Sequence, residues 1–124
     1  MRNAASEQPG LFDPPAVDEK IGEAVLWALG EFQSRGFELA GRKLALDRLL
    51  GAIRRAFEEF GLWPVEDSEI AEQLRSAGAE VEELPGYVAK HPFRVTVRKQ
   101  LSEASLKFYK DRTEAAAAGR STRE

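Results

Sequence analysis

The sequence contains no cysteine, a single histidine and a single methionine in 124 residues. The lack of cysteine excludes disulfides and thiolate metal sites, and it is typical of a protein in a reducing compartment. His91, the only histidine, precedes Pro92, and one histidine without cysteine forms neither a common metal site nor a nucleophilic triad. The glycines match no phosphate-binding pattern. We therefore predict no metal, no cofactor and no enzymatic activity.

Long hydrophobic runs are also missing. No stretch reaches the 18 apolar residues of a membrane-spanning helix, and the polar N-terminal segment with Glu7 does not resemble a signal peptide. We expect a cytoplasmic protein that does not enter membranes. The formal net charge of −3 argues against a protein that coats nucleic acid through bulk positive charge, although a local basic face stays open.

The composition that is present is that of a globular domain, with 43% hydrophobic and 31% charged residues. The length fits one domain. We predict a flexible N-terminal tail over residues 1–15, a single domain over 16–112, and a frayed C-terminal tail over 113–124, which holds an alanine run and Gly119.

Helical periodicity dominates the predicted domain. Apolar residues recur on one helix face from Val17 to Phe32, and Gly36 is a stop signal. A second helix is expected after Gly41, with an apolar stripe made of Leu46, Leu49, Leu50, Ile53, Phe57 and Phe60. A third, short helix is expected from Asp67 or Ser68 to Gly78. The aromatic residues of this region are interpreted as core: Trp27, Phe32, Phe37, Phe57, Phe60 and Trp63.

Two extended segments follow the third helix. Residues 79–84 alternate in part, and residues 93–97 alternate with high β-propensity, so a hairpin across the 85–92 loop is expected before a last helix over 98–112. The order of helix, short helix and hairpin over residues 42–97 resembles a winged helix. We predict a mainly α fold with one small β-hairpin, in which a compact helical domain has a winged-helix-like second half.

A short motif stands in the N-terminal tail. Gln8-Pro9-Gly10-Leu11-Phe12 resembles the pentapeptide with which bacterial replication and repair proteins dock on the β sliding clamp: glutamine, two variable residues, then Leu-Phe. The resemblance implies that Leu11 and Phe12 fill an apolar pocket while Gln8 forms hydrogen bonds at its edge. Pro9 and Gly10 stand where leucine and a small polar residue are more usual. Two other readings stay open, namely packing of Leu11 and Phe12 on the first helix and docking on another partner.

Charge is segregated along the second half of the chain. Residues 66–83 hold seven acidic residues and one basic residue, whereas residues 90–112 hold seven basic and two acidic residues. Cations around the expected hairpin are candidates for contacts with nucleic-acid phosphates: Lys90, Arg94, Arg98 and Lys99. The acidic third helix disfavours the usual insertion of a recognition helix into the major groove, and the charged segments can also simply pair with each other.

These patterns favour a binding protein. The leading prediction is a non-enzymatic accessory protein of DNA replication, repair or mobile-element maintenance, with the bacterial sliding clamp as partner and DNA as a possible second one. The alternatives are a winged-helix DNA-binding regulator, and a helical oligomerising protein that uses the first helix as its subunit interface.

Overall fold

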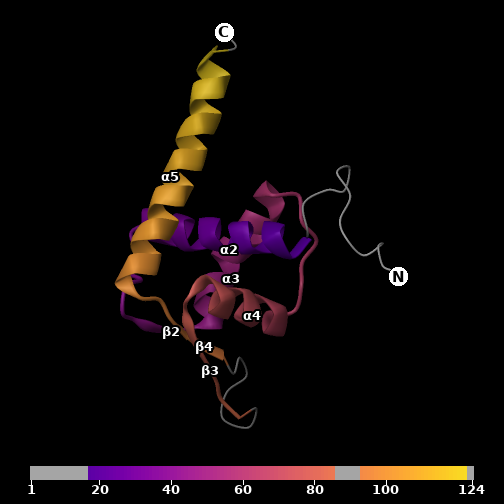
Figure 1. Ribbon diagram of the computed structural model, residues 1–124, viewed down its shortest axis with the longest axis vertical. Helices are drawn as coiled ribbons and strands as arrows, with labels where there is room; N and C mark the ends of the chain where they lie inside the picture. Colours follow the sequence, from indigo (N-terminus) through magenta and orange to yellow (C-terminus); the bar gives the residue numbers. More distant parts are fainter. Residues whose placement is uncertain (1–16, 86–92, 123–124) are drawn as a thin grey trace, which may run out of the picture.

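In the computed structural model, the described residues are 17–85 and 93–122, and helix α2 (Val17–Ser34) lies at their centre. Its apolar stripe is buried, with Val25 and Leu29 fully enclosed, because α3, α4 and α5 all pack on it (Figure 1). The helix ends at the turn with Gly36, whose φ of 98° suits glycine. Three helices pack on α2, and its exposed residues include Glu19, Lys20 and Glu23, so the oligomer alternative stays a prediction.

The second helix begins later than the sequence predicts. Residues Lys43–Ala45 form strand β2, and α3 spans Leu46–Glu59. The predicted apolar stripe is correct, since Leu46, Leu49 and Ile53 are buried. The preceding residues become a strand because Leu44 and Ala45 pair with β4, a contact that local periodicity does not reveal.

The third helix, α4, spans Asp67–Ala77 and confirms the prediction. It follows the extended Glu66, and acidic residues Asp67 and Glu69 occupy its first turn, where they interact favourably with the helix dipole. Gly78 ends it in the left-handed conformation with φ of 110°, as expected for a glycine C-cap.

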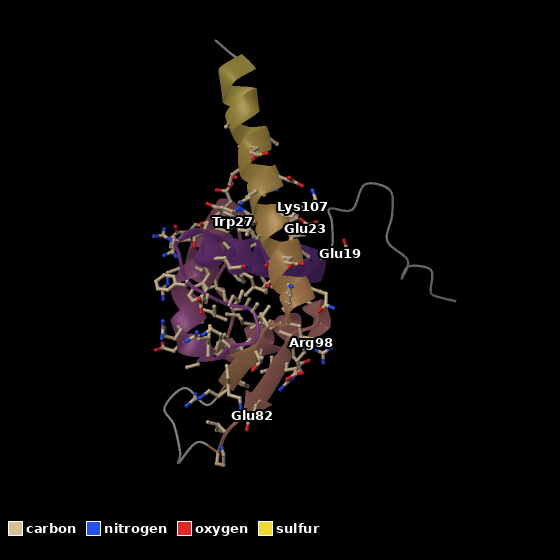
Figure 2. All side chains as sticks on the ribbon, turned by 90° about the vertical axis from the view of Figure 1, so that its left-hand side faces the viewer. Glu19, Glu23, Trp27, Glu82, Arg98 and Lys107 are labelled. Atoms are coloured by element: carbon tan, nitrogen blue, oxygen red, sulfur yellow. The ribbon has the colours of Figure 1, made fainter. Side chains whose placement is uncertain are left out.

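The predicted hairpin exists and gains a third strand. Strands β3 (Glu80–Glu83) and β4 (Phe93–Thr96) are antiparallel, and β2 pairs with the other edge of β4, so the sheet order is β2-β4-β3. Figure 2 shows Glu82 on this sheet and Arg98 where the chain leaves it for α5. Helix, strand, two helices and a hairpin in this order form a winged-helix-like arrangement, which therefore begins at α2 and not at residue 42.

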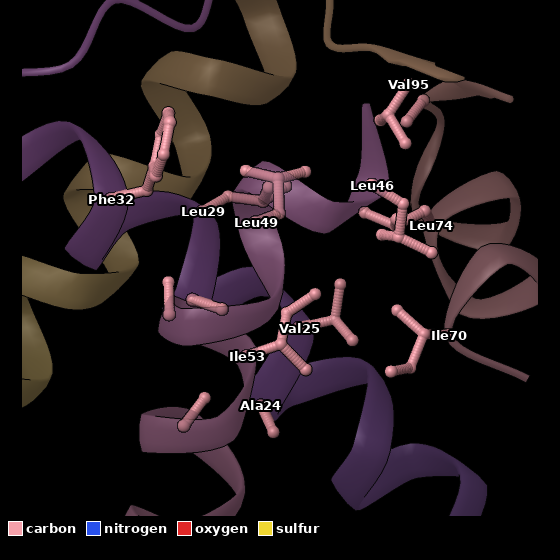
Figure 3. Packing of buried hydrophobic residues seen from close by; sticks show 14 of the residues in the cluster. Ala24, Val25, Leu29, Phe32, Leu46, Leu49, Ile53, Ile70, Leu74 and Val95 are labelled. Atoms are coloured by element: carbon pink, nitrogen blue, oxygen red, sulfur yellow. The ribbon is translucent and has the colours of Figure 1, made fainter. Parts of the chain in front are cut away.

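One hydrophobic cluster joins these elements. Side chains from α2, α3, α4 and β4 meet in it, including Val25, Ile53, Ile70 and Val95 (Figure 3). Two of the six aromatic residues predicted as core are instead on the surface, because Phe37 is 47% exposed and Trp63 is 87% exposed. Both lie in connections between helices, where spacing along the chain says little about burial.

The last helix, α5, spans Lys99–Thr122 and so continues well past the predicted end at Arg112. The alanine run expected to fray is helical, in keeping with the high helix propensity of alanine. Its first half packs across α2, where Gln33 Nε2 donates hydrogen bonds to Ser102 O at 2.9 Å and to Ser105 Oγ at 3.0 Å. Its second half extends beyond the other elements (Figure 1).

Candidate functional site

Four residues of the predicted sites lie outside the described residues. They are the three residues predicted to bind the clamp, Gln8, Leu11 and Phe12, and the residue Lys90. The described residues begin at Val17, a few residues after Phe12 in the sequence. The buried hydrophobic residues among them lie between Ile21 and Val97.

The remaining predicted cations lie on the central strand of the sheet and at the start of α5, close to carboxylates of β3. Arg94 lies on the central strand β4 and is half-buried, whereas Arg98 and Lys99 are exposed where α5 begins. Arg98 Nη2 is 3.1 Å from Glu80 Oε2 on β3. In the strand register Arg94 stands opposite Glu82. The fold thus places acidic side chains of β3 directly among the predicted phosphate-binding residues.

A second ion pair involves a carboxylate of strand β3. Lys43 Nζ on β2 reaches across β4 to Glu82 Oε1 at 3.0 Å. Both side chains are more than half exposed, and exposed pairs contribute about 0–1 kcal/mol, so a polyanion can compete for the cation. The outer face of the sheet is therefore a mixed-charge surface.

The outer face of α4 is not basic either. Its exposed residues include Ser68, Glu72, Arg75 and Ser76, and Arg75 pairs with Glu72 within the helix. In a winged helix this is the element that enters the major groove. An acidic helix with its one arginine already paired is poorly suited to contact a phosphate backbone, as the sequence indicates.

Packing of α2 against α3 creates a basic region that the linear charge pattern does not show. Arg55 binds Glu31 through two hydrogen bonds, Nε to Oε2 at 2.7 Å and Nη2 to Oε1 at 2.9 Å, and Arg35 Nε donates to the same Oε2 at 2.9 Å. Glu31 is only 5% exposed. Burial raises the pKa of Glu31, but the hydrogen bonds and charges of the two arginines outweigh it, so the pKa lies below its usual 4.5.

A shallow pocket adjoins this region at the turn after α2. It has a volume of about 200 Å³, and the residues that line it include Phe37, Arg42, Leu44 and Arg48. The exposed ring of Phe37 stacks on Phe32 with centroids 4.9 Å apart. Arg42 Nη1 is 2.7 Å from Glu38 Oε1, and Arg48 is exposed on α3. The pocket thus combines an aromatic ring, two guanidinium groups and the carboxylate of Glu38, which pairs with one of them.

Sequence analysis missed this basic and aromatic face. Residues 31–55 hold six basic and three acidic residues, a smaller excess than that of residues 90–112. The available signal was the spacing of Arg48 and Arg55, which lie seven residues apart and hence on one side of a helix. This spacing alone does not indicate a site, because Phe37 and Arg42 are brought to Arg48 by the turn after α2.

A larger groove lies between α3 and α4. It has a volume of about 430 Å³ and is lined mainly by apolar side chains, including Leu50, Ile53, Phe57, Leu62 and Ile70. The exposed Trp63 follows Leu62 in the same connection. Ile53, Phe57 and Ile70 belong to the buried core, and Arg54, Glu58 and Asp67 also line the groove, so its exposed surface is partly polar.

Two kinds of feature are absent from the part of the chain that the structure describes. Within residues 17–85 and 93–122, no group of three or more His, Asp or Glu side chains is arranged to hold a metal ion. No helix of that part of the chain is both long and apolar enough to cross a bilayer. Searches for a matching protein family, a related curated protein and a similar solved structure each found no match. Function must therefore be argued from the residues themselves.

Proposed function

We propose that this protein is a non-enzymatic accessory protein of bacterial DNA replication, repair or mobile-element maintenance that docks on the sliding clamp. The observation that carries the proposal is the peptide Gln8-Pro9-Gly10-Leu11-Phe12, which resembles the clamp-binding motif. Leu11 and Phe12 are the apolar anchors, and Gln8 supplies the polar contact at the edge of the pocket.

The architecture of the body supports this proposal. The described residues already form one hydrophobic core, whose buried hydrophobic side chains lie between Ile21 and Val97. A short peptide that adjoins a folded body loses little conformational entropy on binding, and Pro9 reduces that loss further. The groove between α3 and α4 and the exposed Trp63 also fit a protein whose role is to contact other macromolecules.

The proposal is tested by titrating the full-length protein against a purified bacterial sliding clamp in a calorimeter. We expect a dissociation constant of about 1–100 μM and at least a tenfold loss when Leu11 and Phe12 are both changed to Ala. The matched control is Asp13→Ala, a change in the same segment but outside the motif, which should bind like the wild type. Circular dichroism should be the same for all three proteins. Absence of wild-type binding, or equal binding by the double variant, would refute clamp docking.

A second candidate function is that of a winged-helix DNA-binding regulator. The strand order β2-β4-β3 and the helix order favour it, whereas the carboxylates of Glu80 and Glu82 beside the hairpin cations oppose it. This candidate requires duplex binding that falls steeply with salt and that weakens in Arg98→Ala and Lys99→Ala. Binding that is insensitive to both substitutions would remove the regulator from consideration.

A further inference from the structure

The strongest unassigned surface is the face formed by Phe37, Arg42, Arg48 and Arg55, which we call the α3 face. We propose that the α3 face binds single-stranded nucleic acid, with the Phe37 ring stacked on a base and the guanidinium groups on phosphates. This inference goes beyond clamp docking and does not depend on it, because no clamp is needed for the interaction.

The first support is the arrangement of the cations. Arg48 and Arg55 lie seven residues apart on α3, which is two helical turns and about 10.5 Å along the axis. Arg55 gives Nε and one hydrogen of Nη2 to Glu31, which leaves its Nη1 donors for a ligand. The buried carboxylate therefore orients this guanidinium in advance, and less conformational entropy is lost when it binds a phosphate.

The second support is the aromatic ring. Phe37 is 47% exposed, yet its stacking on the buried Phe32 at 4.9 Å holds the ring in place. The adjoining pocket of about 200 Å³ has Arg48, Arg42 and Glu38 in its lining, and Arg42 pairs with Glu38. A base stacked on Phe37 would place its phosphates near Arg48. A phosphate can also compete with Glu38 for Arg42, because both side chains of that pair are exposed. Proteins that bind single strands combine such a stacking ring with a basic track along the backbone.

Charge and base accessibility favour a single strand over a duplex and over other partners. Stacking on Phe37 requires an unpaired base, because the faces of bases inside a duplex are already stacked. The acidic residues of α4 and β3 repel a phosphate backbone from the winged-helix contact surface, whereas residues 31–55 carry twice as many basic as acidic residues. A polyanion is thus attracted to the α3 face although the whole chain is acidic.

The test measures fluorescence anisotropy of a labelled 15-nucleotide oligo-dT strand with the full-length protein at 50 mM salt. We expect binding that weakens as salt rises, and a loss of about tenfold in affinity for Phe37→Ala and for Arg48→Gln. Arg48→Gln should also make the salt dependence shallower by about 0.7 in the logarithmic slope, because one phosphate contact is lost. Phe37→Leu keeps an apolar side chain and should bind almost as weakly as Phe37→Ala.

Arg54→Gln is the matched control, because Arg54 is an exposed arginine of the same helix that lines the α3–α4 groove instead. It should bind like the wild type. The inference is overturned if the wild type does not bind, if Arg54→Gln weakens binding as much as Arg48→Gln, or if a duplex binds more tightly than the single strand. It is also overturned if Arg98→Gln abolishes binding while Arg48→Gln does not, which would assign the contact to the hairpin. None of these outcomes affects the calorimetric test of clamp docking.

Discussion

Gly30 is the position where α5 crosses α2 most closely. A Cβ atom at residue 30 would lie 2.3 Å from Ser105 O and 2.4 Å from Tyr109 Cβ, far inside the 3.0 Å that real contacts respect. Neither atom is the end of a flexible side chain, so the substitution Gly30→Ala forces the two helices apart. The contacts on either side of the crossing, Trp27 on Tyr109 at 5.0 Å and the hydrogen bonds of Gln33, would be strained as well.

The expected size of the effect follows from two opposing contributions. Alanine in a helix interior is favoured over glycine by about 1 kcal/mol. Overpacking of a tight contact costs about 1–3 kcal/mol, and because this contact involves backbone atoms we expect the upper part of that range, about 2–3 kcal/mol, which exceeds the gain. We expect Gly30→Ala to lower the free energy of unfolding by about 1–2 kcal/mol, which is a decrease in Tm of roughly 4–8 °C for a domain of this size.

Gly22→Ala is the control for this reasoning. It is the same substitution in the same helix, but its Cβ would meet only Gln73 Oε1 at 3.4 Å, the tip of a movable side chain. It should therefore gain stability by about 0.5–1 kcal/mol from helix propensity. The measurement is urea unfolding followed by circular dichroism. If Gly30→Ala were as stable as Gly22→Ala, with unchanged helix content, the conclusion that α5 passes too close to residue 30 for a Cβ atom would be refuted.

Three further predictions concern the ion pair, the tryptophans and the end of α5. Glu31→Gln should cost about 1–3 kcal/mol at pH 7, because two guanidinium groups lose a charged acceptor. Because the pKa of Glu31 is lowered from 4.5, the wild type has this extra stability in full above pH 4.5 and loses it as the pH falls through the lowered pKa. If the wild type and Glu31→Gln differed in stability by the same amount at pH 7 and in strong acid, the charged interaction of Glu31 with the two arginines would be contradicted. Trp27→Ala should cost about 3–5 kcal/mol in thermal unfolding, whereas Trp63→Ala should stay within about 0.5 kcal/mol, because the two side chains are 8% and 87% exposed. Ending the chain at Thr113 should change the Tm by less than about 3 °C, because residues 114–117 are exposed, and a larger loss would mean that this part of α5 is covered in solution.

Local patterns predicted the existence of the helices but not the start of α3 or the end of α5. The apolar stripes of α2 and α3 and the glycine after α4 follow from spacing and from backbone preferences that act within a few residues. The hairpin strand over Phe93–Thr96 was also predictable, because its alternation places Phe93 and Val95 on the buried face. Strand β2 was not predictable, because its three residues are extended only through pairing with β4, some fifty residues later.

The candidate site divides in the same way. The motif that resembles a clamp-binding peptide is a run of adjacent residues, so the sequence alone reveals it. Clamp binding itself stays a prediction. The hairpin cations were found by charge counting, which cannot show that Glu80 and Glu82 would stand beside them. The α3 face was missed because its residues are spread between Phe37 and Arg55 and meet only where the turn after α2 returns to α3.

The sequence by itself determined the helical class, the bounds of the apolar helix faces and the segregation of charge, because these depend on residue type and on periodicity along one element. Only the tertiary structure decided which charges are paired, which aromatic rings are exposed and how closely α5 passes Gly30. Those properties depend on the distance between side chains from different elements. That distance is set by the packing of α2 against α3 and α5, and no local pattern contains it.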